Sequence, residues 1–261
     1  MKNLITILSF GVLLFSCNKK ENKEISNTKS NSTETKKEFV VDSIRVQDSV
    51  QVAKTLTLSF EKQILLFPNI TNKTILDSIY KPANITSADY SKKTLTDVLE
   101  KFKTQSLKKD DSQDYMPEYK QTWDEVSGMK LISKQSDVLT LQYSGSGYSG
   151  GAHGYYFEAY KTFDLKHNKV ISQTDIFKNP TNANWNKVLQ NHFDEPEQKE
   201  MLLVDKIELN NNFYFDQDKI TFVYNQYEIT AYAAGVVYIT LNFKDIKDQL
   251  KPEFIKQNNI K

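Results

Sequence analysis

The densest group of residues able to bind or react lies between Tyr148 and Tyr156. This stretch reads Tyr-Ser-Gly-Gly-Ala-His-Gly-Tyr-Tyr, in a chain that has only 8 glycines and 3 histidines. Glycine adopts positive φ without strain and lets another chain or ligand come close, while tyrosine offers a flat ring with a hydrogen-bonding hydroxyl. Two interpretations stay open: a structural turn, or a recognition surface with Tyr148, His153, Tyr155 and Tyr156 as ligand-binding residues.

Serines beside this histidine raise the question of nucleophilic catalysis. Ser144, Ser146 and Ser149 suggest a serine–histidine pair with His153, which would make the chain an envelope hydrolase acting on glycan or peptide. A nucleophile elbow has the pattern Gly-x-Ser-x-Gly at a strand-to-helix turn. Here Tyr143 stands where the first glycine is needed, and the next segment reads as a strand. We therefore predict no catalytic residue and keep the hydrolase as the alternative.

Metal binding has little support in the sequence. The three histidines are His153, His167 and His192. His167 falls in a predicted turn and is interpreted as exposed, whereas His192 lies on the apolar side of a short helix and is interpreted as a core or cap residue. Zinc needs three or four converging ligands, and no close pair such as His-Glu-x-x-His is present. We predict no metal and no cofactor.

The N-terminal segment, residues 1–17, has the layout of a secretory signal: Lys2, an apolar run over residues 4–15, then Ser16 and Cys17. A run of about a dozen apolar residues is too short to cross a bilayer, which takes about 20. Leu-Phe-Ser-Cys at residues 14–17 resembles the bacterial lipobox, which implies a palmitate-type lipid anchor on Cys17, the only cysteine of the chain. An ordinary signal peptide is the alternative.

A polar linker follows the cysteine. Residues 18–38 contain Ile25 as their only large apolar side chain, so we predict a disordered tether over 18–39. In lipoprotein sorting, Asp after the cysteine favours the inner membrane, and Asn18 leaves delivery to the outer membrane open. We expect a protein of the bacterial cell envelope, lipid-anchored in the outer membrane and periplasmic or surface-exposed.

Charge and composition exclude one class of partner. The chain has 34 basic and 33 acidic residues, for a net charge of +1, without a concentrated basic stripe. Nucleic-acid binding needs clustered cations that displace counterions, so we predict no nucleic-acid partner. Aromatic residues make up 12 % of the chain, which favours a β-rich fold.

The hydrophobic pattern predicts strands and helices in separate clusters. Strands are predicted at 44–52, 55–66, 119–126, 129–134, 138–143, 155–165, 170–171, 212–215, 219–224 and 236–243, and helices at 70–80, 87–107, 184–194 and 244–250. Because the two types do not alternate one by one, we predict an α+β fold with a mainly antiparallel sheet and a few packed helices. We expect two small subdomains, 40–130 and 131–251, and a tail over 252–261.

The order of the motifs over residues 44–250 resembles one bacterial family. The matching pieces are Tyr-Ser-Gly-Gly-Ala-His-Gly at 148–154, Thr-Phe-Asp-Leu at 162–165, Thr-Asp-Ile-Phe at 174–177, Phe-Tyr-Phe at 213–215, Tyr-Glu-Ile at 227–229 and Ala-Tyr-Ala-Ala-Gly at 231–235. They resemble the C-terminal domain of the ectodomain of sigma-V anti-sigma factors, which also occurs beside the catalytic domain of a peptidoglycan deacetylase.

That resemblance implies an extracellular α+β module without a shared reaction. The anti-sigma relative binds lysozyme through its ectodomain, so the resemblance implies a binding module for a lysozyme-like protein or for a cell-wall ligand such as a peptidoglycan fragment. The deacetylase relative relies on a separate catalytic domain with metal-binding Asp and His motifs, and nothing in this sequence corresponds to that domain.

Overall fold

The computed structural model describes residues 38–108 and 116–260. The predicted signal peptide, Cys17 and almost all of the predicted tether lie outside these residues. Residues 39–261 form one compact unit, and it contains every element discussed below.

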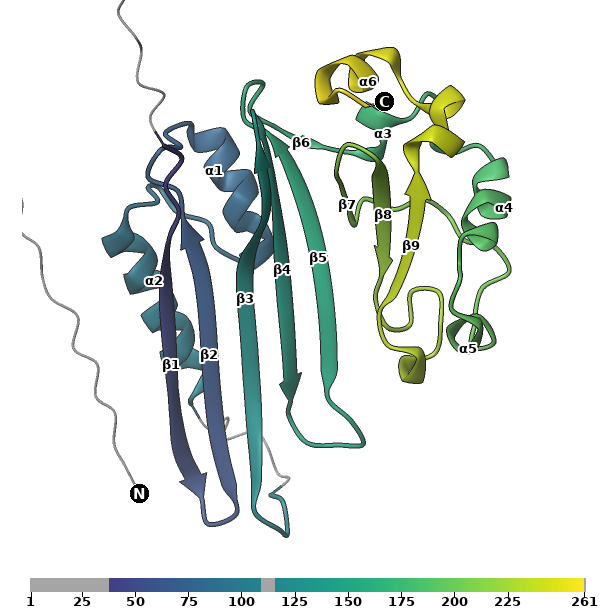
Figure 1. Cartoon of the computed structure of the whole chain (residues 1–261). Helices are drawn as coiled ribbons and strands as arrows, with labels where there is room; N and C mark the ends of the chain where they lie inside the picture. Colours follow the sequence, from purple (N-terminus) through teal and green to yellow (C-terminus); the bar gives the residue numbers. More distant parts are fainter. Residues whose placement is uncertain (1–37, 109–115, 261) are drawn as a thin grey trace, which may run out of the picture. The chain divides into compact units, whose positions relative to one another are not determined.

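Two β-sheets and several helices make up this unit (Figure 1). The strands are β1 (Asp42–Ala53), β2 (Leu56–Leu66), β3 (Gln121–Gln135), β4 (Val138–Tyr148), β5 (Tyr155–Asp164), β6 (Lys169–Ile171), β7 (Phe213–Phe215), β8 (Lys219–Tyr224) and β9 (Val237–Asn242). The α-helices are α1 (Lys73–Tyr80), α2 (Lys92–Ser106), α3 (Gln173–Ile176), α4 (Asn184–Asn191), α5 (Pro196–Lys199) and α6 (Pro252–Asn258). Short 3-10 helices are η1 (Lys81–Ala83), η2 (Tyr232–Ala234), η3 (Phe243–Asp245) and η4 (Lys247–Gln249).

The larger sheet has six strands in chain order, β1-β2-β3-β4-β5-β6. Neighbouring strands are antiparallel except β2 and β3, which pair in parallel. A parallel pair needs a crossover connection, and α1, η1 and α2 provide it. The predicted α+β fold with a mainly antiparallel sheet is confirmed.

Helices α1 and α2 lie against one face of this sheet (Figure 1), where period-two alternation along the strands places apolar side chains. Ile44, Ile64 and Leu141 from the sheet pack with Ile79 and Leu99 from the helices in one buried cluster. The side chains of Asn72 and Ser91 cap the two helices by accepting hydrogen bonds from the main-chain N–H groups of Ile75 and Thr94, as short polar residues do at helix starts.

The second sheet, β7-β8-β9, is antiparallel throughout. Its apolar side chains form a separate cluster with residues of α3, α4 and α6, including Phe177, Trp185, Phe222 and Phe254. Each of the two sheets thus has its own buried cluster. The predicted division at residues 130 and 131 falls inside the continuous strand β3.

Several local predictions differ from the structure. The strands predicted at 119–126 and 129–134 are one strand, because Gly128 pairs with Gln63 on one side and Ser144 on the other. Hydrogen-bonded neighbours on both sides outweigh the low strand propensity of Ser-Gly. The predicted helix 244–250 consists of η3 and η4, and α6 occupies most of the predicted tail, where Phe254 and Ile260 are buried.

Candidate functional site

The four predicted ligand-binding residues lie around the turn that connects β4 to β5. In this turn Gly150 and Gly151 have φ values of +87° and +104°, which only glycine adopts without strain. A Cβ atom on Gly150 would also lie 2.9 Å from the ring of Trp123. The Tyr148 hydroxyl donates to the Gly151 carbonyl oxygen at 3.0 Å. The backbone geometry at both positions and the Trp123 ring beside Gly150 therefore explain why glycine occupies positions 150 and 151, without any ligand.

His153 is exposed and stacks on Tyr232, with ring centroids 4.0 Å apart and planes inclined by 29°. Its Nδ1 lies 2.8 Å from the Gly154 carbonyl oxygen, which also accepts the Tyr232 hydroxyl at 2.9 Å. Among the residues that the structure describes, no serine hydrogen-bonds to His153. The structure thus does not bring together the serine–histidine pair that the hydrolase alternative requires.

Tyr155 and Tyr156 point to opposite faces of the six-stranded sheet, as adjacent strand residues must. The Tyr155 ring covers Gly147 of β4 on the helix face, where a Cβ would lie 2.8 Å from its Cε1. Tyr156 lies on the other face and donates its hydroxyl hydrogen to Glu158. Both rings are partly exposed, at 51 % and 40 %, so a single ligand on one face contacts only one of them.

Glu158 is a buried carboxylate at the centre of a tyrosine cluster. Its Oε2 accepts the hydroxyls of Tyr160 and Tyr238, each at 2.7 Å, while Oε1 accepts that of Tyr156. Tyr160 in turn accepts from the side-chain amide of Gln142 at 2.9 Å. Because Tyr238 belongs to β9, this cluster connects the two sheets.

The charges in the cluster depend on the balance between burial and hydrogen bonding. Burial raises the pKa of Glu158, but the hydrogen bonds from Tyr156, Tyr160 and Tyr238 outweigh it, so the net pKa lies below the usual glutamate value. Burial and the bond to Glu158 together raise the pKa of Tyr156 to about 12. At neutral pH the cluster is one carboxylate surrounded by neutral phenols, with no proton poised for transfer.

The main chain of Glu158 is held as firmly as its side chain. Its N–H donates to the Asn225 side-chain oxygen at 2.7 Å, and its carbonyl accepts the amides of Asn212 and Asn225 at 2.8 and 3.0 Å. The next alternate residue, Tyr160, donates its N–H to Asn212 at 2.6 Å. Asn212, just before β7, and Asn225, just after β8, thus pair with the unpaired stretch of the β5 edge.

A cavity of about 340 Å³ opens beside Tyr156 on the polar face of the sheet. Residues of β2, β3, β4 and β5 line it, and they are Glu61, Gln63, Val126, Ser127, Gly128, Met129, Lys130, Gln142, Ser144, Gly145, Ser146 and Tyr156. Gly128 forms an open part of its floor, because no atom lies within 4 Å of the position where a Cβ would stand. The lining combines carboxylate, amide, hydroxyl and ammonium groups with one exposed phenol ring.

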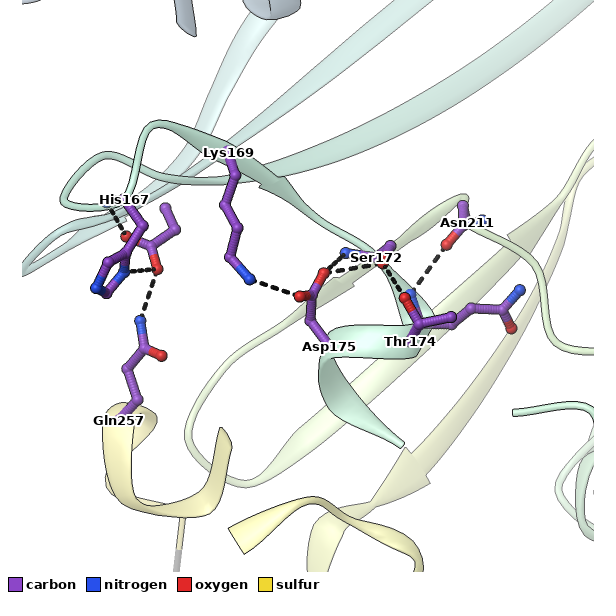
Figure 2. A network of polar contacts seen from close by, with 9 residues as sticks. His167, Lys169, Ser172, Thr174, Asp175, Asn211 and Gln257 are labelled. Atoms are coloured by element: carbon purple, nitrogen blue, oxygen red, sulfur yellow. Dashed lines mark hydrogen bonds and ion pairs between the residues drawn. The ribbon is translucent and has the colours of Figure 1, made fainter. Parts of the chain in front are cut away.

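A second polar network lies at the other end of β5, in the turn to β6 (Figure 2). The carboxylate of Asp164 is 1 % exposed and accepts from His167 twice, from the main-chain N–H at 3.0 Å and from Nδ1 at 2.6 Å. Gln257 of α6 donates its side-chain amide to the same carboxylate at 2.8 Å. Burial raises the pKa of Asp164, but these hydrogen bonds outweigh it and hold the net pKa below the usual value.

The neighbouring contacts in Figure 2 stabilise the start of α3. Asp175 accepts from the N–H of Ser172 at 2.8 Å and pairs with Lys169 at 2.5 Å. Asn211 accepts the N–H of Gln173 at 3.0 Å. A capping box of this kind satisfies the free N–H groups of a helix start, so this part of the network is structural.

In the described parts of the chain, no three His, Cys, Asp or Glu side chains are grouped so that they could bind a metal ion. Over the same residues, none of the helices combines the length and the apolar character needed to cross a bilayer.

The family profile described as "Protein of unknown function (DUF3298)" matches residues 83–244, which include the Glu158 cluster, the turn between β4 and β5, and Asp164 with His167. The chain belongs to the DUF3298 family. A search of curated proteins found no match.

Two solved structures of DUF3298 proteins have the same fold. A family member from Bacteroides fragilis NCTC 9343 aligns with a TM-score of 0.67 at 21 % identity, over 84 % of this chain and 96 % of that one. A family protein from Pseudomonas aeruginosa PAO1 aligns with a TM-score of 0.57 at 16 % identity, over 82 % of this chain and 96 % of that one. At these identities the likeness shows the fold alone.

Glu158 and Asp164, the carboxylates at the centres of the two networks in this DUF3298 fold, were not among the predicted site residues. Period-two spacing places Tyr156, Glu158 and Tyr160 on one face, which is a signal that the sequence contains. Tyr238 lies 80 residues from Glu158, so no local pattern joins them. The pairing of Asp164 with His167 spans three residues, but the bond from Gln257 of α6 to the buried Asp164 carboxylate spans 93.

Proposed function

We propose that this chain is a lipid-anchored protein of the bacterial cell envelope whose folded unit is a non-enzymatic binding module. The observation that carries the proposal is the cavity of about 340 Å³ beside Tyr156 on the polar sheet face. Its volume falls in the range of about 300–1,000 Å³ that is usual for small-molecule sites. Tyr156 is the predicted site residue that lines it.

The chemistry of the lining favours a glycan of the cell wall as ligand. Sugar hydroxyls both donate and accept hydrogen bonds, and the Gln63, Gln142 and Ser144 side chains offer both kinds of group. The exposed ring of Tyr156 provides the flat apolar surface on which the C–H face of a sugar ring packs. One carboxylate and one ammonium, from Glu61 and Lys130, leave the cavity without net charge.

The Glu158 cluster supports this site by fixing its aromatic wall. The hydrogen bond from Tyr156 to Glu158 restrains the tyrosine ring, and Gln142 is restrained by its bond to Tyr160. Side chains that are already ordered lose less conformational entropy when a ligand binds. Glu158 therefore acts as a positioning residue.

Calorimetric titration of the full-length chain with soluble muropeptides tests the proposal. We expect Tyr156→Ala and Gln142→Ala each to weaken binding at least about tenfold, the equivalent of about 1.4 kcal/mol. The matched control is Tyr155→Ala, which removes the adjacent ring on the opposite face and leaves glycan binding unchanged. Absence of heat with every muropeptide, or equal losses in Tyr155→Ala and Tyr156→Ala, would contradict the glycan site.

A lysozyme-like protein, the ligand implied by the anti-sigma resemblance, is the second candidate. The observation that favours it is a pair of exposed aromatic rings on the helix face, Tyr155 and Phe157, at 51 % and 38 % exposure. Exposed aromatic residues are enriched where proteins meet. In this case lysozyme binds the chain, Tyr155→Ala abolishes that binding, and Tyr156→Ala does not.

The lipid anchor has a separate test, because it depends on residues outside the described part of the chain. We expect radiolabelled palmitate to enter the chain in bacteria and Cys17→Ala to abolish labelling, since Cys17 is the only cysteine. Fractionation of the envelope then reports whether the labelled chain is in the outer membrane. Unchanged labelling of Cys17→Ala would refute the anchor without affecting the binding proposal.

A further inference from the structure

A second cavity, of about 720 Å³, lies where three turns and a helix meet, with His167 of the Asp164 network in its lining. Its walls come from the β3–β4 turn, the β5–β6 turn, the β7–β8 turn and α6. These segments are distant in sequence, and the hydrogen bond from Gln257 to Asp164 ties α6 to the β5–β6 turn (Figure 2). The volume is again in the range of about 300–1,000 Å³ that small ligands occupy.

Charges of both signs line this cavity without neutralising each other. Lys166 and Lys256 contribute ammonium groups, while Asp137, Asp216 and Glu253 contribute carboxylates. Within residues 38–108 and 116–260, none of these five side chains takes part in an ion pair. A ligand with one positive and one negative end could pair its positive end with a carboxylate and its negative end with a lysine.

His167 adds an oriented hydrogen-bond acceptor to the same wall. An ionised carboxylate only accepts hydrogen bonds, so the contact between Nδ1 and Asp164 requires Nδ1 to carry the hydrogen. In the neutral imidazole this leaves Nε2 as an acceptor, and no described residue hydrogen-bonds to it. Because Asp164 is buried and holds the ring in place, the acceptor is preorganised.

From this arrangement we infer that the cavity binds a small zwitterion, namely a free amino acid or a short peptide with unblocked ends. The ammonium end donates to Nε2 of His167 and faces the carboxylates of Asp137, Asp216 and Glu253. The carboxylate end pairs with Lys166 or Lys256, and Phe215 and Val138 offer apolar contact to a side chain.

Charge disfavours two other classes of ligand. An uncharged ligand would form no ion pair with the five charged groups, and a dianion would face three carboxylates. This site differs from the proposed glycan site in its cavity, its residues and its ligand class, so either can fail without the other.

The test titrates the full-length chain with L-alanyl-L-alanine and follows amide chemical shifts. Three blocked forms are compared: the N-acetyl dipeptide, the dipeptide amide, and the form blocked at both ends. We expect the free dipeptide to bind, each singly blocked form to bind at least about tenfold more weakly, and the doubly blocked form not to bind.

Variants locate the site. We expect His167→Gln and Lys256→Gln each to weaken dipeptide binding at least about tenfold, whereas His153→Gln, a matched exposed histidine outside the cavity, leaves it unchanged. Lys256 does not touch Asp164, so its variant keeps the test valid if His167→Gln alters folding. Equal affinity for free and doubly blocked dipeptide, no binding up to about 10 mM, or equal losses in His153→Gln and His167→Gln would overturn the inference.

Discussion

Two turns of the six-stranded sheet, each with an exposed histidine, differ in what holds that histidine. In the glycine-rich turn between β4 and β5, His153 stacks on Tyr232, and its Nδ1 lies 2.8 Å from the neighbouring carbonyl oxygen of Gly154. In the turn between β5 and β6, His167 is fixed by the buried carboxylate of Asp164. His153 in the β4–β5 turn therefore contacts a ring and a neutral carbonyl group. His167 in the β5–β6 turn is held by a charge-assisted hydrogen bond to a carboxylate.

The difference follows from what each turn must satisfy. Positive φ at Gly150 and Gly151 and the nearby ring of Trp123 explain the glycines by backbone geometry. At the other turn a buried carboxylate must receive hydrogen bonds, because an unpaired buried charge is costly. The unusual glycine content of the β4–β5 turn reflects the positive φ values that its backbone needs. The preorganised side chain, His167, lies in the β5–β6 turn, whose composition is ordinary.

The largest expected effect is at Asp164. Asp164→Ala leaves two N–H groups of His167 and the amide of Gln257 without their acceptor, so we expect a loss of about 2–4 kcal/mol in the free energy of unfolding. Chemical denaturation measures it. The control Asp97→Ala removes an exposed ion pair within α2 and should change stability by less than about 0.5 kcal/mol. Equal losses in the two variants would show that the Asp164 network is not stabilising.

The next largest effect tests the backbone explanation of the glycine-rich region. A Cβ on Gly147 would lie 2.6 Å from the Asp124 carbonyl oxygen and 2.8 Å from the Tyr155 ring. We expect Gly147→Ala to cost about 1–3 kcal/mol through overpacking, measured by chemical denaturation. Gly128→Ala is the matched control in the neighbouring strand, since nothing lies within 4 Å of its added carbon. A larger loss in Gly128→Ala would contradict this account.

Acidification should lower the free energy of unfolding by less than Asp164→Ala does, because a protonated Asp164 keeps its side chain in place in the β5–β6 turn. The folded-state pKa values of Asp164 and Glu158 lie below their ordinary values of 3.8 and 4.5. Their stabilisation is therefore complete above those values and is lost as pH falls through the lower folded-state pKa. We expect the free energy of unfolding to fall on acidification below about pH 4.5, and to fall less steeply in Asp164→Asn and Glu158→Gln. Denaturation curves at successive pH values check this, and an unchanged slope in both variants would disprove it.

The smallest effect is expected at His153. His153→Ala removes one exposed stack on Tyr232, so we expect a loss of at most about 1 kcal/mol in the free energy of unfolding. His167→Ala should cost more, because it removes the hydrogen bond from Nδ1 to the buried carboxylate of Asp164. The reverse order would invalidate the comparison between the two turns.

Local periodicity was enough to predict most elements of the fold. Alternation in residues 55–66 and the helical stripe of Leu95 and Leu99 gave β2 and α2 close to their observed bounds. Prediction failed at residues 127–128 and 144–147, where Ser and Gly indicated breaks but β3 and β4 continue. Pairing with neighbours on both sides and the rings of Tyr155 and Phe157 over the glycines compensate for their low strand propensity.

The candidate site was predicted only in part for a related reason. Tyr156 was identified from composition, because clustered tyrosines are visible in any linear stretch. Glu158 and its partner Tyr238 were not, since hydrogen bonds between strands 80 residues apart depend on how the two sheets meet. His167 was interpreted as exposed, and its ring is 54 % exposed, but its fixed orientation depends on a buried neighbour.

By itself the sequence determined the α+β class, the positions of most strands and helices, and the unusual backbone between β4 and β5. These properties follow from periodicity and residue type, which act over a few neighbouring residues. The tertiary structure alone decided which side chains share a cavity, that Glu158 gathers three phenols, and that Asp164 is buried beneath α6. Side chains from distant segments become buried and come together only after folding. Their burial and mutual orientation set the strength and direction of the polar contacts that we propose bind a ligand.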